Sequence, residues 1–403
     1  MEYFKLECAY QDDKKIPLSK EGGAPNNTYT LITGRNATGK SRLLRKIVSH
    51  YIFPEQKNIF NQNDVITETY SLRAPQKVIA ISTGATDKFP YTQNKKTQIP
   101  YHYIGGSFRG MGAPRPTSTL SNSFLQVIKQ RAENTFSPIS LSHIFSELGY
   151  MPIVTIHIQP PSTFTFNYSQ KSKNIKLERF DEAKKLGGVY TFYLEEEEKN
   201  PSKLNLISEF IEEGLLRIRN VDLYREGDKN KVSIGDASSG QHCMLQIFIG
   251  IAASLKNNSL VCIDEPEISL HPEWQLNFIN TLQQLFWNYK GCHFIIATHS
   301  PQIVSGLKTR NGLVVNLEES ADYLPEFYAE RSADFQLAEI FGTPGYKNEF
   351  LIRESLNLLT KIANEKRFKD SDRSSLETLK SLHPKLTKND PVKILIDQIL
   401  ALV

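Results

Sequence analysis

The pattern of hydrophobic and polar positions predicts strands and a helix in the first hundred residues of this 403-residue chain. Short apolar runs of strand length occur at residues 3–10, 28–34 and 77–82. After the second run, apolar residues recur every three or four positions, as on one face of a helix that packs against a sheet. These residues are Leu43, Leu44, Ile47, Val48 and Tyr51.

A second group of strands and helices is predicted from about residue 205 onward. An amphipathic helix comes first, followed by two short runs that predict a hairpin, at 215–224 and 230–236. An almost uniformly apolar helix then precedes two buried strands, at 259–265 and 292–300, with a helix between them that ends at Gly291. This strand, helix, strand order predicts parallel strands and an α/β fold.

Between these two groups the periodicity weakens and Pro, Ser and Asn become frequent, which predicts an insertion. The residues after the last strand have a helical pattern and end in an apolar periodic stretch. The predicted division is therefore a first lobe at 1–100, an insertion at 101–190, a second lobe at 191–325 and a helical extension at 326–403. We expect the extension or the insertion to dock a partner.

The composition excludes two classes of protein and indicates a compartment. With 39% hydrophobic and 23% charged residues, the chain is neither disordered nor fibrous. No apolar run approaches the roughly 20 residues that cross a bilayer, and the first residues lack the apolar core of a signal peptide. We therefore expect a cytoplasmic protein with no membrane partner. The four scattered cysteines are expected to be reduced core thiols and not metal ligands.

The charge of the chain leaves nucleic acid open as a partner. A net charge of +4 permits such contact but does not require it. The basic clusters at 171–176 and 366–369 are more typical of a solvated surface than of a row of phosphate contacts.

A glycine-rich loop with the spacing G-x-x-x-x-G-K-[ST] follows the second predicted strand. Gly34 and Gly39 let the backbone curl so that its N–H groups point at phosphate oxygens, and the start of the next helix adds positive potential. At this spacing Lys40 contacts the β and γ phosphates of a nucleotide, and Ser41 ligates Mg²⁺. The residues expected around the nucleotide are Gly34, Arg35, Asn36, Ala37, Thr38, Gly39, Lys40, Ser41 and Arg42.

Two carboxylates end the apolar strand at 259–265. Asp264 and Glu265 therefore lie at the carboxyl end of a strand, where parallel α/β sheets bind ligands. We expect Asp264 to hold Mg²⁺ with Ser41, and Glu265 to orient and polarise the attacking water. The alternative is a helix N-cap acid with an acidic neighbour.

His299 follows the strand that begins at 292, 34 residues after Glu265. At the same sheet edge, its imidazole could hold a γ-phosphate or the attacking water, so the predicted catalytic residues are Glu265, His299 and Lys40. The alternative is a histidine that only makes structural hydrogen bonds.

The segment 236–242 places four small or polar residues at the start of the apolar helix: Ser238, Ser239, Gly240 and Gln241. Hydroxyl groups and exposed amides at a helix N-terminus form a second candidate anion site. A plain Ser N-cap is the alternative, and it is the simpler explanation of the isolated stretch.

Together these motifs resemble those of the ATP-binding-cassette (ABC) ATPases, because they occur in the order of that superfamily: phosphate loop, signature, Walker B Asp-Glu and switch His. The resemblance implies a P-loop ATPase head with a mixed sheet, and ATP and Mg²⁺ as cofactors. It also implies a homodimer in which ATP is sandwiched between subunits, with Ser238 and Gly240 of one subunit capping the nucleotide bound by the other.

Further segments narrow the resemblance. "DEPEISLHPEWQ" and "ATHSPQIVS" look like the RecF, SMC-like and overcoming-lysogenization-defect branch. "VIAISTGATDKFP", "YHYIGG" and "RSADFQLAEIFGTPG" are similar to the standalone ATPases of anti-phage systems, such as Septu-type, retron-associated and PARIS-type ATPases. The resemblance implies an ATP-hydrolysing sensor and scaffold subunit that controls a separate effector, expected to be a nuclease.

The chain also departs from the ABC pattern. Its signature, A-S-S-G-Q, lacks the usual Leu and first Gly, and the glutamine of the Q-loop has no identifiable counterpart. Asp370 and Asp372 form the D-x-D of Toprim nucleases, but their polar flanks supply no strand to present them, so no intrinsic nuclease is expected. Two other functions stay open: a DNA-repair or DNA-clamping ATPase of the RecF or SMC type, and a nucleotide-dependent scaffold that does not hydrolyse ATP.

Overall fold

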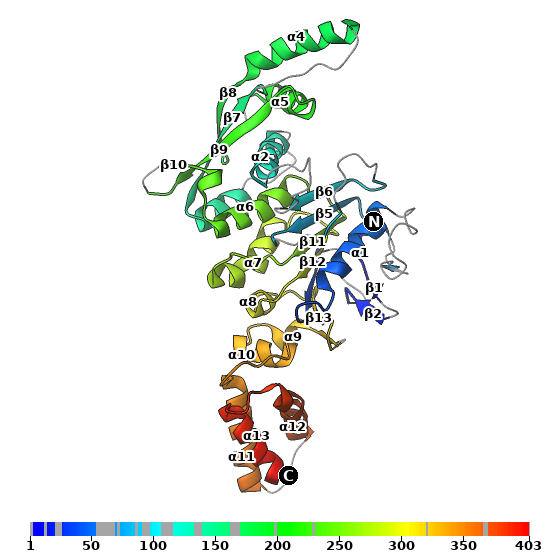
Figure 1. Ribbon diagram of the computed structural model, residues 1–403, viewed down its shortest axis with the longest axis vertical. Helices are drawn as coiled ribbons and strands as arrows, with labels where there is room; N and C mark the ends of the chain where they lie inside the picture. The colour runs from blue at the N-terminus through cyan, green and yellow to red at the C-terminus, as the bar shows by residue number, and fades with distance from the viewer. Residues whose placement is uncertain are drawn as a thin grey trace.

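The centre of the molecule is a seven-stranded sheet in the computed structural model of the chain (Figure 1). The structure describes residues 3–11, 14–20, 26–53, 69–70, 73–84, 88–90, 97–105, 116–132, 139–161, 170–196, 200–227, 230–319, 321–365 and 370–402. In spatial order the strands are β14 (Ala321–Tyr323), β13 (Gly312–Asn316), β3 (Thr28–Thr33), β12 (His293–Ala297), β11 (Ser259–Asp264), β5 (Lys77–Ser82) and β6 (Tyr101–Gly105).

The pairing of these strands brings the ends that carry the candidate chemistry to one edge of the sheet. Only β14 is antiparallel to its neighbour, so β13, β3, β12, β11, β5 and β6 all point the same way. The predicted α/β class with a mixed sheet is confirmed, and so is the parallel pairing of β11 with β12. Both strands are buried along their whole length, which explains their nearly continuous apolar sequence.

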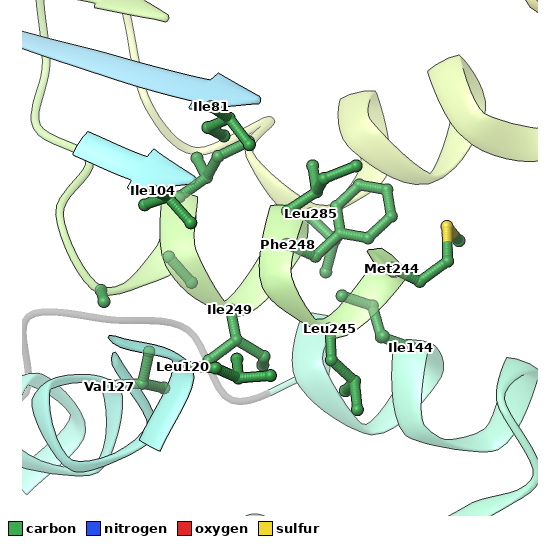
Figure 2. Packing of buried hydrophobic residues seen from close by; sticks show 14 of the residues in the cluster. Ile81, Ile104, Leu120, Val127, Ile144, Met244, Leu245, Phe248, Ile249 and Leu285 are labelled. Carbon is green, nitrogen blue, oxygen red and sulfur yellow. The ribbon is translucent and has the colours of Figure 1, made fainter. Parts of the chain in front are cut away.

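Different helices cover the two faces of the sheet, because side chains alternate along each strand. Helix α1 (Lys40–Ile52) covers one face and buries all five residues of its predicted apolar stripe. Helices α6 (Ser239–Ala252) and α7 (Pro272–Leu285) cover the other face. Figure 2 shows α6 at the centre of this second core, with Phe248 beside Leu285 of α7 and Ile249 toward Leu120 of α2 (Pro116–Ala132).

The predicted end of α7 at Gly291 is wrong. The helix ends at Leu285, and the chain then makes a turn in which the Tyr289 N–H donates to the Phe286 carbonyl. The backbone N–H of Lys290 donates to Asn257 Oδ1, and its carbonyl accepts from the N–H of Asn258. Hydrogen bonds to the segment before β11 thus replace those that would have continued the helix.

A four-stranded antiparallel sheet lies at one end of the molecule (Figure 1). Its strands are, in spatial order, β10 (Lys231–Ser233), β9 (Arg217–Arg225), β7 (Tyr150–Gln159) and β8 (Gly188–Tyr193). The predicted hairpin of β9 with β10 is confirmed. The helices of this region are α2, α3 (Ile139–Glu147), α4 (Gln170–Leu186), which joins β7 to β8, and α5 (Pro201–Glu212).

This sheet does not follow the predicted division of the chain. Strand β8 crosses the boundary placed at residue 190, and β6 of the predicted insertion pairs with β5 of the first lobe. Buried residues of α2, α3, β7 and β9 belong to the same hydrophobic cluster as one face of the seven-stranded sheet. A continuous hydrophobic core therefore joins the four-stranded sheet to the seven-stranded sheet and its helices, which we call the head.

The C-terminal part of the chain is helical, as expected. After α8 (Pro301–Ser305), β13 and β14 come α9 (Pro325–Tyr328), α10 (Ala333–Phe335) and a π-helical turn at Gln336–Ile340. Helices α11 (Glu349–Glu365), α12 (Asp370–Leu382) and α13 (Pro391–Leu402) then pack around a hydrophobic cluster of their own. A small sheet of β1 (Cys8–Gln11), β2 (Lys14–Pro17) and β4 (Thr69–Tyr70) completes the fold.

The structure also describes the cysteines and the apolar character of the helices. All four cysteines are buried thiols that form no disulfide among the described residues. Among the helices that the structure describes, none has the length and apolar character needed to cross a bilayer.

A buried histidine makes the stability of the head sensitive to acid. The Nδ1 atom of His293 accepts from the Leu6 N–H at 3.2 Å, and its Nε2 lies 2.9 Å from the Thr30 hydroxyl. Burial lowers the pKa of His293 to about 3. Because the unfolded chain takes up this proton at about pH 6.5, the folded state is expected to lose up to about 1.4 kcal/mol per pH unit as the pH falls below that value.

Urea-unfolding midpoints measured at pH 7.5, 6.5 and 5.5 test this expectation. Wild type should lose stability across the series more steeply than His293→Asn, in which an amide oxygen replaces the Nδ1 acceptor and cannot titrate. The matched control is His143→Asn, because His143 is half exposed on α3. Parallel pH dependences in wild type and His293→Asn would contradict the prediction.

Candidate functional site

The loop between β3 and α1 has the backbone conformation of an anion-binding cradle. Gly34, Ala37 and Gly39 have φ values of 140°, 70° and 102°, so the chain curls three times into the left-handed region. A Cβ atom on Gly34 would lie 2.8 Å from the Thr38 hydroxyl. Gly39 precedes α1 and has no side chain to cap it, so the first turn of this 13-residue helix faces the loop without a side-chain cap.

Lys40 lies buried beneath this loop. Its Nζ donates to the carbonyl oxygens of Gly34 and Arg35, at 3.0 and 3.4 Å. The same atom lies 2.5 Å from Nε2 of His299 and 3.8 Å from Oε1 of Glu265. Burial lowers the pKa of Lys40, and the nearby carboxylates oppose this effect. The ammonium group is thus held at the point where the loop meets the two strand ends.

Ser41 and Asp264 lie side by side and fit a magnesium ion. The Ser41 hydroxyl donates to Asp264 Oδ1 at 3.0 Å, and Asp264 is buried at the end of β11. A hydroxyl and a carboxylate are the hard oxygen donors that Mg²⁺ prefers, and such sites take their remaining ligands from phosphate and water. These two residues would hold the ion beside the loop.

Glu265 turns out of β11 into the site. Its φ of 53° is a left-handed conformation that non-glycine residues seldom adopt. Its Oε1 lies 3.1 Å from Nε2 of His299. Burial acts to raise the pKa of Glu265, but hydrogen bonds from His299 and Glu267 and the charge of Lys40 lower it below its usual value. The carboxylate is therefore ionised at neutral pH and available as a base.

These groups surround one cavity of about 430 Å³. From the loop it is lined by Asn36, Ala37, Gly39, Lys40, Ser41 and Arg42, and from the strand ends by Asp264, Glu265 and His299. Three of the residues predicted in the loop do not line it, namely Gly34, Arg35 and Thr38. The Arg35 guanidinium pairs with Glu318 at 3.5 Å, and the Thr38 hydroxyl donates to the Arg35 carbonyl, so both side chains stabilise the loop from outside.

The residues predicted to form a second anion site lie outside this cavity. Ser238, Ser239, Gly240 and Gln241 begin α6 and do not line this cavity. Ser238 is the N-cap residue of α6, which is the role that the alternative interpretation gives it. Its hydroxyl accepts a hydrogen bond from the Gln241 N–H, and the Gln241 side chain accepts one from the Ser238 N–H. A Cβ atom on Gly240 would lie 2.7 Å from the Ser269 carbonyl and 2.8 Å from the Trp274 ring, so the residue has to be glycine.

Gln241 also ties the start of α6 to the four-stranded sheet. Its side-chain amide donates to the Leu148 carbonyl at 2.9 Å, and its Oε1 accepts from the Tyr150 hydroxyl at 3.0 Å. Tyr150 begins β7, and Leu148 lies two residues before it. These two hydrogen bonds tie the position of the α6 N-terminus to the start of that sheet.

Several residues at the site were not predicted. Thr83 follows β5 and donates its hydroxyl to the Glu265 carbonyl, while Gly84, Lys88 and Ile268 line the cavity. Glu267 accepts hydrogen bonds from Thr298 and His299. The available signal for Glu267 was a third acidic residue, two positions after Glu265, in an otherwise apolar and turn-forming stretch.

The Asp370–Asp372 pair and the basic clusters noted in the sequence are not part of the described site. Asp372 is buried and pairs with Lys361 at 2.5 Å, whereas the side chain of Asp370 lies outside the described residues. The basic cluster at 366–369 and the side chains of the cluster at 171–176 also lie outside them.

Comparisons with known proteins agree with the predicted resemblance. Residues 147–305 match the family described as AAA domain, putative AbiEii toxin, Type IV TA system. The chain is 34% identical to the Retron Ec83 probable ATPase of Escherichia coli over 97 residues, which are 21% of this chain and 17% of that protein. It is 25% identical to the Septu protein PtuA of Bacillus mycoides over 93% of this chain and 48% of that protein.

A further relative comes from a phage. Protein ea59 of Escherichia phage lambda is 25% identical over 70% of this chain and 47% of its own length. The chain thus spans no more than about half the length of these curated relatives. Residues 147–305 thus resemble an AAA domain, and the chain is related to a retron ATPase and to a Septu protein.

Proposed function

We propose that the chain binds and hydrolyses Mg-ATP as a dimerising ABC-type ATPase. The observation that carries this proposal is the convergence of two motifs, more than 200 residues apart in the sequence, on one cavity. Lys40 and Ser41 come from the loop, and Asp264, Glu265 and His299 come from two neighbouring strand ends. This set supplies a phosphate-binding cation, an oxygen site for Mg²⁺ and a base, which are the parts that nucleoside triphosphate hydrolysis requires.

Each residue has a distinct part in the proposed reaction. The curled loop and Lys40 bind the β and γ phosphates, and Ser41 and Asp264 hold the metal ion. When bound, Mg²⁺ neutralises charge on the phosphates. Glu265 accepts a proton from the attacking water, and the Nε2 atom of His299, beside both Glu265 and Lys40, fixes the position of the γ-phosphate.

The position of the α6 N-terminus supports the proposed dimer. Ser238 and Ser239 are exposed, begin a 14-residue helix and lie away from the cavity of their own chain. A helix start of this kind attracts anions. We propose that it caps the ATP bound by a second copy, so that ATP joins two chains head to tail.

The relatives support a role in anti-phage defence. They include a retron ATPase and a Septu protein, and the Septu protein aligns along nearly the whole of this chain. We propose a cytoplasmic sensor and scaffold that closes on ATP and controls a separate nuclease effector, which docks on helices α11–α13 or on the four-stranded sheet. A DNA-repair or DNA-clamping role remains the competing hypothesis, and it requires that DNA stimulate ATP turnover.

The test is solution mass measured by light scattering, with and without Mg-ATP, together with phosphate release. Wild type and Glu265→Gln should dimerise on ATP, and Glu265→Gln should stay dimeric because it does not turn over. Ser238→Arg should remain monomeric while still binding ATP, since its change lies outside the cavity. A mass that is indifferent to ATP in all three proteins would show that ATP does not join the subunits, and turnover that rises with DNA would favour the competing role.

A further inference from the structure

Glu267 is a buried carboxyl group that joins the ends of the two central strands. It lies in the loop after β11, and both of its oxygens point to the residues that follow β12. Oε1 accepts from the backbone N–H of His299 at 2.5 Å, and Oε2 accepts from the Thr298 hydroxyl at 2.9 Å. Two consecutive residues, the second of which carries the imidazole of the site, are therefore fixed by one side chain.

Hydrogen bonds also fix the loop that carries Glu267. The Ile268 N–H donates to the Glu265 carbonyl at 3.3 Å, and the Leu270 N–H donates to the Glu267 carbonyl at 3.0 Å. The carbonyl of Glu265 also accepts from the Thr83 hydroxyl at the end of β5. Because the loop is held at both of its acidic residues, Glu267 provides a stationary anchor for His299.

Glu267 also contacts Glu265 directly. The two carboxyl groups are hydrogen-bonded to each other, and such a bond between two acids requires a proton. Burial, the hydrogen bond to Glu265 and the charge of Glu265 raise the pKa of Glu267 to about 8. The proton therefore resides on Glu267 at neutral pH, and Glu265 keeps its negative charge.

The other titratable groups near Glu267 come from three elements. Lys40 belongs to α1, Cys243 to α6, and His299 follows β12. Lys40 is the cation of the set, while burial raises the pKa of the Cys243 thiol to about 12 and keeps it neutral. Above about pH 8, ionisation of Glu267 would place its negative charge next to that of Glu265. The ammonium group of Lys40 would then have to balance both carboxylates.

We propose that Glu267 is a positioning residue, which holds the imidazole of His299 and the carboxylate of Glu265 in their working orientation. It does not contact the cavity, and it acts through these two residues. This inference rests on the proposed ATPase function. It adds to the predicted site a residue whose neutral carboxyl group is the functional form.

Two substitutions separate this role from simple core packing. Glu267→Gln keeps one oxygen that can accept from the His299 N–H and gains an amide that can donate, as the neutral acid does, while the Thr298 hydroxyl has to accept from this amide instead of donating. Glu267→Ala has neither group. We expect Glu267→Ala to lower kcat about tenfold with KM nearly unchanged, and Glu267→Gln to stay within about threefold of wild type at pH 7. Wild-type kcat should decline above about pH 8, and Glu267→Gln should lack this decline.

A second readout needs no nucleotide. In protein labelled with ¹⁵N-histidine, the imidazole resonances of His299, assigned with His299→Gln, should move in Glu267→Ala and stay in place in Glu267→Gln. The matched control is Glu273→Ala on the exposed start of α7. Unchanged kcat and unchanged His299 resonances in Glu267→Ala would overturn the inference, and so would a Glu267→Gln variant as impaired as Glu267→Ala. If wild type has no ATP turnover, the proposed function fails, whereas the resonances still decide the positioning role.

Discussion

Replacing Glu265 with Gln is expected to lower ATP turnover by about a thousandfold while leaving ATP binding intact. The amide has the shape of the carboxylate but cannot accept the proton of the attacking water. The neighbouring groups also favour the charged form that a base requires, since hydrogen bonds from His299 and Glu267 and the charge of Lys40 lower the pKa of Glu265. Removal of the base should therefore act on kcat and not on affinity.

Phosphate release under single-turnover conditions, combined with calorimetric ATP binding, measures the two effects separately. The matched control is Glu273→Gln, because Glu273 is exposed in the first turn of α7. It should turn over like wild type. A Glu265→Gln protein that hydrolyses ATP within about tenfold of wild type would refute Glu265 as the base and would indicate that another group activates the water.

Replacing Lys40 with Met is expected to weaken Mg-ATP binding by at least about a hundredfold, which corresponds to about 2.7 kcal/mol. Lys40 is the buried cation of the cavity, and its Nζ lies 3.8 Å from Glu265 Oε1. Without it, the phosphates would meet the carboxylates of Asp264 and Glu265 with less positive charge between them. The electrostatic cost is large because Lys40 and Asp264 are buried, where charges interact more strongly than in water.

Isothermal calorimetry with Mg-ATP measures this loss, and the thermal midpoint of each variant shows whether it is folded. Lys308→Met is the matched control, because Lys308 pairs with Glu330 on the surface, where both side chains are largely exposed. It should bind ATP as wild type does. An unchanged ATP dissociation constant in Lys40→Met would place the nucleotide outside this cavity.

The phosphate loop and the two central strands could be predicted because their signals are local. Glycines at positions 34 and 39 specify the loop, and the next apolar residues, spaced as on a helix face, specify α1. In β11 and β12, uninterrupted apolar residues indicate strands buried on both sides, and the polar residues that follow them mark the sheet edge. Within each of these segments, the residues that specify the structure lie close together in the sequence.

The rest could not be predicted because it depends on contacts between distant segments. The sequence near β6 and β8 resembles that of any short strand, and which sheet each joins is set by pairing with β5 and β7. Glu267 lies in a turn-forming stretch typical of a solvated loop. Its burial and raised pKa arise because Thr298 and His299, more than thirty residues later, close over it. Nothing in its local sequence carries that information.

The helical unit of α11, α12 and α13 has an independent core, and this has an evolutionary consequence. Its hydrophobic cluster is separate from the two clusters that build the head. Polar contacts at the joint include those of the Asn348 amide with the Asp334 carbonyl, of the Glu349 N–H with Asp334 Oδ2 and of Lys385 with Glu319. Substitutions within this unit need to be compatible mainly with one another. For the proposed defence role, this means that the outer surface of the unit can change without disturbing the cavity at the sheet edge.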